Sequence, residues 1–142
     1  MRSDWPIRVA TWAGALIAGG LFGVAGTVMH SAVVVDTGIA GLVIPLGMLI
    51  GAVGSLALLV AVRILADRGT TLATGLGMLA MLLVFSGEGP GGSVVVPAPA
   101  DGAPPLGIIW SWTLAIIVLL VVAWPDLRGL SVAPRERTSA DA

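Results

Sequence analysis

The chain has 142 residues, of which 57 % are apolar and 11 % are charged, against roughly 25 % charged residues in an average soluble protein. The charged residues leave four uncharged runs of 27, 26, 19 and 24 residues, namely Val9–Val35, Thr37–Val62, Gly69–Gly87 and Gly102–Pro125. A helix of about 20 apolar residues spans the hydrocarbon core of a bilayer. The composition therefore excludes an ordinary soluble domain and predicts a membrane protein with four spans.

The residue types that are missing exclude several kinds of chemistry. Without cysteine the chain has no thiolate nucleophile, no iron–sulfur ligand and no cysteine zinc site. Without lysine it has no Schiff-base or phosphate-loop lysine. The formal net charge of −1 predicts no attraction to nucleic acid. We expect no catalytic residue, no cofactor and no metal.

In chain order the sequence predicts an all-α membrane protein made of two antiparallel helical hairpins. The expected parts are a cytoplasmic segment 1–8, a transmembrane domain 9–124 with spans at 9–31, 39–65, 69–86 and 106–124, and a disordered cytoplasmic tail 125–142. Pro45 is expected in the first turns of the second span, where its missing N–H costs little. Residues 87–105 are rich in glycine and proline and predict an outer loop without helix.

The arginines orient the predicted spans. All seven lie in segments on one side: Arg2, Arg8, Arg63, Arg68, Arg128, Arg135 and Arg137. Because arginine-rich short loops stay in the cytoplasm, we expect both termini inside and a multi-pass protein of the cytoplasmic membrane. Trp110 and Trp112, near the outer end of the fourth span, are expected at the headgroup level. A cleaved signal peptide is the alternative for the first span, but its apolar core is typically only about 7–15 residues long, so we favour an uncleaved span.

Two valine triplets are expected on the outer face, one at 33–35 and one at 94–96. Either the first triplet continues the first helix, or the two triplets pair as a short external ribbon. We favour the first alternative, because valine is common in membrane helices and its strand preference depends on context.

Four side chains on the predicted outer face are candidates for binding a divalent cation or relaying protons: His30, Asp36, Glu88 and Asp101. They lack the regular helical spacing of a metal site. The competing interpretation, which we favour, is an interfacial histidine bonded to a loop carbonyl with solvated acids around it. At mid-depth the predicted spans carry no Asp, Glu, Lys or Arg. A proton-coupled exporter would need an ionisable side chain there to exchange protons, and this chain has none at that depth.

Glycines form a stripe on each of the first two spans. The first is Gly19, Gly23, Gly26 together with His30, and the second is Gly47, Gly51 and Gly54. Small residues at this spacing, as in the GxxxG pattern, let helix backbones approach closely. We predict that the two stripes face each other, with Gly19 level with Gly51 and Gly23 level with Gly47. A glycine-lined substrate groove is the alternative.

The sequence resembles an actinobacterial domain-of-unknown-function family of small four-span integral membrane proteins. The similar segments are 26–30, at the end of the first span, 41–45 and 63–65 at the ends of the second, and 89–97 in the outer loop. The resemblance implies an uncharacterised integral membrane protein and carries over no activity.

These patterns favour a non-enzymatic accessory or scaffold subunit of a cell-envelope assembly. Its expected partners are the lipid bilayer and either another membrane protein or a second copy of itself. The alternative is a small oligomeric transporter or channel-like protein for a neutral or lipidic solute.

Overall fold

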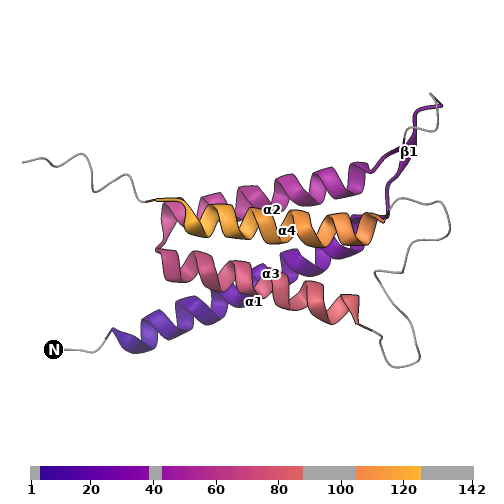
Figure 1. The fold of residues 1–142 in the computed structure, drawn as a ribbon. Helices are drawn as coiled ribbons and strands as arrows, with labels where there is room; N and C mark the ends of the chain where they lie inside the picture. The colour runs from indigo at the N-terminus through magenta and orange to yellow at the C-terminus, as the bar shows by residue number, and fades with distance from the viewer. Residues whose placement is uncertain (1–3, 39–42, 88–104, 126–142) are drawn as a thin grey trace, which may run out of the picture.

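The computed structural model describes residues 4–38, 43–87 and 105–125, and within them the chain forms four helices and one short ribbon (Figure 1). The helices are α1 (Trp5–Met29), α2 (Leu46–Leu65), α3 (Arg68–Ser86) and α4 (Leu106–Ala123), and the strands are β1 (Val35–Asp36) and β2 (Val43–Ile44). Each helix is long and apolar enough to cross a membrane. The prediction of an all-α protein with four candidate spans is confirmed.

The helix ends follow local chemistry. Helix α1 begins at Trp5, ahead of the predicted residue 9, with Pro6 in its first turn, where a missing N–H costs nothing. Helix α2 begins at Leu46 and not near residue 39, because Pro45 precedes it and disfavours helical backbone at Ile44. The predicted start of the second span is therefore wrong at residues 43–44, which are in β2.

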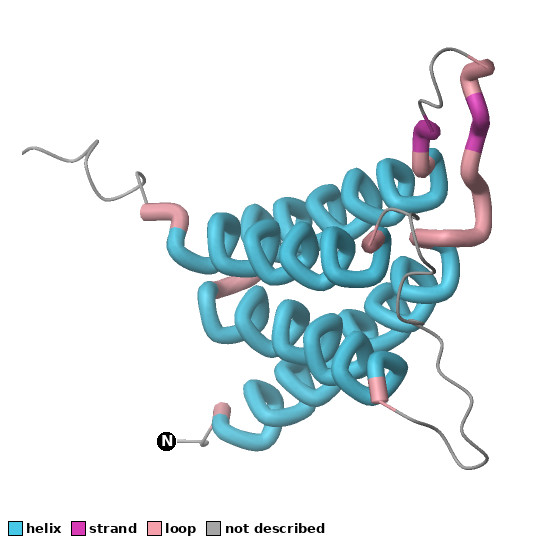
Figure 2. Tube along the Cα trace, turned by 45° about the vertical axis from the view of Figure 1, so that its right-hand side comes forward, coloured by secondary structure: helices cyan, strands magenta, loops and turns pink. Residues whose placement is uncertain are grey.

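The ribbon lies beyond the ends of α1 and α2 (Figure 2). Strands β1 and β2 are antiparallel, with Val35 opposite Ile44 and Asp36 opposite Val43. The Asp36 carboxylate accepts the Gly38 backbone N–H over 2.9 Å, and Gly38 has a φ of 67°, which glycine adopts without strain. The expectation that the first valine triplet continues the helix is wrong, since α1 ends at Met29. The second triplet lies outside the described residues, as do Glu88 and Asp101.

Successive helices run in opposite directions, so different connecting segments gather at the two ends of the bundle (Figure 1). One end holds the start of α1, the turn between α2 and α3, and the end of α4. The arginines that the structure describes, Arg8, Arg63 and Arg68, belong to this end, which we call the arginine end. The other end holds the ribbon and His30, and we call it the histidine end.

Helix α1 crosses α3 in the most extensive helix contact, and α2 runs beside α4 (Figure 1). The large buried apolar side chains come from α2, α3 and α4: Leu59, Met78, Leu82, Trp110, Leu114, Val118 and Val121. Helix α1 instead buries small residues, four glycines and Thr27. Other large apolar side chains remain exposed on the outside of the bundle, as lipid-facing residues do.

Candidate functional site

The buried polar groups at the histidine end form a cluster of Thr27, His30 and Trp110. All three side chains are essentially inaccessible. Thr27 and His30 lie three residues apart and therefore on the same face of α1. The Trp110 indole N–H donates to the Thr27 hydroxyl oxygen over 3.3 Å, and the His30 Nδ1 atom contacts the Thr27 carbonyl oxygen.

The histidine ring is fixed by this arrangement. The His30 Nδ1 atom is directed at the Thr27 carbonyl oxygen, which can only accept a hydrogen bond. The ring stacks on Trp110, with the ring centres 6.2 Å apart and the planes 14° from parallel. Asp36 lies exposed on the ribbon, where it accepts the Gly38 N–H. Within the described ranges, no three His, Asp or Glu side chains are grouped to hold a metal ion.

Glycines make the space that Trp110 fills. A Cβ atom at Gly26 would lie 2.7 Å from the indole, and one at Gly51 would lie 3.1 Å from it. Gly51 also faces the Gly26 Cα atom, so α1 and α2 approach each other closely at this level. The cluster therefore ties α1, α2 and α4 together at the histidine end.

The other glycines of the α1 stripe do not face α2. A Cβ atom at Gly19 would overlap the Thr74 carbonyl group, and one at Gly23 would lie 2.6 Å from the Met78 carbonyl oxygen, both on α3. Gly47 lies against the Met29 carbonyl oxygen at the end of α1. The predicted pairing of Gly19 with Gly51 and of Gly23 with Gly47 is therefore wrong.

Helix α3 supplies the matching surface, which the sequence analysis missed. A Cβ atom at Gly77 would overlap the Leu16 carbonyl oxygen of α1. The Thr74 hydroxyl donates to the Thr70 carbonyl oxygen within its own helix over 3.0 Å. Because that hydroxyl is bonded locally, Thr74 acts as a small residue at the contact. The spacing of Thr70, Thr74 and Gly77 repeats the four-then-three spacing of the α1 stripe and is the signal that could have revealed this contact.

Gly54 differs from the rest of the two stripes. Apart from its two chain neighbours and the backbone of its own helix, no described atom lies within 4 Å of a Cβ placed at Gly54. It lines a groove of about 180 Å³ between α1 and α2, with Phe22, Ala25, Gly26, Met29, Ile50, Gly51 and Ser55. Within the described part of the chain, Gly54 therefore leaves an open, small-residue surface.

A second groove lies between α1 and α3 toward the arginine end. Its volume is about 420 Å³, and its walls are Val9, Trp12, Ala13, Leu16, Gly69, Leu72, Ala73 and Leu76. The Arg8 guanidinium lies 5.5 Å from the centre of the Trp12 ring, in cation–π range. Like the α1–α2 groove, it is apolar and lies between helices on the outside of the bundle.

Asp67 caps α3 at the arginine end. Its carboxylate accepts the Thr70 backbone N–H over 2.6 Å. This bond lowers the pKa of Asp67, with a smaller contribution from the Arg8 charge. The Thr71 hydroxyl donates to the Asp67 carbonyl oxygen over 2.9 Å. Both the side chain and the backbone of Asp67 therefore bind the first turn of α3.

We expect Asp67→Ala to lower the free energy of unfolding in detergent at pH 7 by about 1 kcal/mol, the usual loss for an N-cap, and Asp67→Asn to retain most of it. Because the folded-state pKa lies below the usual value of 3.8, the part of the stability due to the ionised carboxylate is present above that pH. It is lost as the pH falls through the folded-state pKa. Thermal unfolding of both variants at pH 7 and pH 3 checks this, and an alanine variant as stable as the parent at pH 7 would contradict it.

Comparison with known proteins gives no match: no family model fits the sequence, and no similar protein is found among the curated proteins or the solved structures. The chain is a small multi-pass membrane protein.

Proposed function

We propose that this membrane protein is a non-enzymatic accessory or scaffold subunit of a larger envelope assembly. The observation that carries the proposal is the open glycine surface at Gly54. The other stripe glycines and the polar cluster of Thr27, His30 and Trp110 are already used in contacts between the helices of this chain. The cell-envelope setting and the actinobacterial family rest on the sequence patterns and belong to the same proposal.

The occupant of the α1–α2 groove is a transmembrane helix of a different membrane protein. Glycine and alanine form much of the groove, and small residues let a second helix backbone approach closely in lipid. Phe22 and Ile50 stand exposed beside it and supply apolar contact area. Helix α2 has the smallest buried share of the four spans, which leaves it the most surface for a partner.

The test is purification of the full chain from its native membrane in mild detergent, with mass spectrometry of the proteins that co-elute. We expect one stoichiometric partner that is lost with Gly54→Leu, which fills the groove. Gly14→Leu is the matched control, because a Cβ at Gly14 also has no atom within 4 Å, and it should keep the partner.

A partner that is retained equally by both variants would contradict the groove as its binding site. A chain that purifies alone as a homo-oligomer and moves a neutral solute in liposomes would overturn the accessory role in favour of a small transporter.

The proposal includes an orientation with both termini in the cytoplasm. The arginine count in the sequence and the placement of Arg8, Arg63 and Arg68 at one end support it. Reporter fusions after Asp36 should be external and those after Arg128 cytoplasmic. An external signal from the latter would contradict the orientation.

A further inference from the structure

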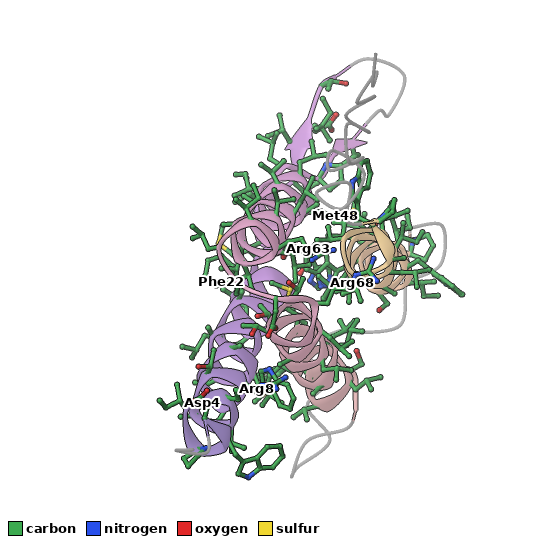
Figure 3. The ribbon with its side chains drawn as sticks, turned by 90° about the vertical axis from the view of Figure 1, so that its left-hand side faces the viewer. Asp4, Arg8, Phe22, Met48, Arg63 and Arg68 are labelled. Carbon is green, nitrogen blue, oxygen red and sulfur yellow. The ribbon has the colours of Figure 1, made fainter. Side chains whose placement is uncertain are left out.

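Ser55 lies in the α1–α2 groove, beside Gly51 and Gly54. It is at the middle of the 20-residue helix α2 and is only 1 % exposed. Phe22, which also lines the groove, lies on the side of the bundle away from α4 (Figure 3). The groove therefore faces the outside of the bundle, and Ser55 places a hydroxyl group at mid-depth in it.

The Ser55 hydroxyl differs from other hydroxyls in the helices. Several of these donate to the carbonyl oxygen four residues earlier: Thr11, Thr71, Thr74, Ser86, Ser111 and Thr113. Within the part of the chain that the structure describes, the Ser55 side chain has no hydrogen bond to its own helix or to a neighbouring one. Because its unbonded oxygen is not fully enclosed by the described residues, it opens into the groove.

A hydroxyl group at this depth in a bilayer needs a hydrogen-bond partner. Acyl chains offer neither donor nor acceptor, so a hydroxyl left in hydrocarbon is unfavourable. Transmembrane helices meet this need with hydrogen bonds from Ser and Thr to a neighbouring helix, and small residues bring the two backbones close enough. A backbone carbonyl oxygen has two lone pairs, and one stays free when the other accepts the bond of its own helix.

We propose that the Ser55 hydroxyl donates a hydrogen bond to a backbone carbonyl oxygen of the partner helix. This inference rests on the proposed partner helix in the α1–α2 groove and adds the chemistry of that helix. The partner carries Gly, Ala or Ser at mid-depth, because a larger side chain would hold its carbonyl oxygen away from Ser55. A lipid acyl chain in the groove would leave the hydroxyl without a bond, which favours a helix as the occupant. Ser55 therefore sets the depth at which the partner helix binds.

Retention of the partner by the purified full chain tests this bond. Ser55→Ala removes the hydroxyl and little volume, and we expect the complex to dissociate about three- to tenfold more readily on dilution in mild detergent, the range for one interhelical hydrogen bond. The variant chain alone should unfold at no lower temperature than the parent, since no described contact within the chain uses the hydroxyl. Ser111→Ala is the matched control. The Ser111 hydroxyl donates to the Gly107 carbonyl oxygen of its own helix over 2.9 Å, so this variant should bind the partner as the parent does.

A second variant locates the contact on the partner. In this cysteine-free chain, Ser55→Cys should form a disulfide with a cysteine placed at the small mid-depth residue of the partner, seen as a mobility shift that reductant reverses. A partner that Gly54→Leu releases but Ser55→Ala binds as tightly as the parent would overturn the hydrogen bond and leave the accessory role intact. The absence of a cross-link at every mid-depth position of the partner would overturn it as well. A partner retained by Gly54→Leu would overturn the groove site itself, and a chain that purifies without any partner would overturn the accessory role too.

Discussion

Gly19→Ala is expected to lower the free energy of unfolding in detergent by about 1–3 kcal/mol, the usual cost of overpacking a close contact. The added methyl group would overlap the Thr74 carbonyl group of α3. Backbone cannot move aside as a flexible side chain can, so α1 and α3 must separate. Thermal or denaturant unfolding, followed by circular dichroism in mild detergent, measures the loss.

The same substitution at Gly14 is the control. It lies on the same helix, but no atom comes within 4 Å of an added Cβ. Alanine is the better helix former by up to about 1 kcal/mol, so Gly14→Ala should leave the stability unchanged or raise it. Equal stability of the two variants would show that α1 and α3 are not in close contact at Gly19.

Trp110→Ala should have a larger effect, a loss of about 3–5 kcal/mol, because removing a buried aromatic ring leaves a cavity. It would also remove the partner of the Thr27 hydroxyl and the ring on which His30 stacks. Since Trp110 lies between α4 and the glycines of α1 and α2, we expect the histidine end of the bundle to loosen first. The unfolding midpoint and the hydrogen exchange of residues 20–29 report this.

Trp112→Ala is the matched control on the same helix. Trp112 is 68 % exposed, whereas Trp110 is fully buried. The control should change the stability in detergent by much less than Trp110→Ala. If the two substitutions cost the same, the indole of Trp110 does not occupy the space between Gly26 and Gly51.

The existence and approximate extent of the four helices could be predicted, because a bilayer requires long uncharged runs and arginines mark where they end. The start of α2 could not be predicted from apolar content alone. Residues 43–44 are as apolar as the helix that follows, and the difference lies in Pro45 and in the pairing of Val43 and Ile44 with β1.

The partner of each glycine stripe could not be predicted for a different reason. A stripe indicates that a backbone comes close but does not say which helix it belongs to. Helices α1 and α2 are adjacent in sequence, and their glycines were expected at the same depths in the membrane, which favoured packing of α1 on α2. In the structure, Gly19 and Gly23 instead face Thr74 and Met78 on α3.

The tryptophans carried a signal that the sequence analysis did not use. Trp110 and Trp112 are two residues apart on a helix, so their side chains point to nearly opposite sides. Both were expected at the headgroup level, and this expectation did not distinguish Trp110, which is inside the bundle, from Trp112, which is exposed. His30 is likewise buried and stacks on Trp110. From the sequence, His30 could be placed only near the membrane interface, because nothing in the sequence indicated its contact with Trp110.

A disulfide cross-link tests most directly the central claim that α1 packs on α3. A Cβ atom at residue 20 lies 3.5 Å from the Met81 Cγ atom, the position that a cysteine sulfur takes. In this cysteine-free chain, Gly20→Cys with Met81→Cys should form an intramolecular disulfide under mild oxidation in the membrane, seen as a mobility shift that reductant reverses. Gly20→Cys with Val53→Cys, which places the second thiol on the exposed side of α2, should stay reduced. A pair at 20 and 81 that stays reduced while the pair at 20 and 53 links would contradict the packing of α1 on α3.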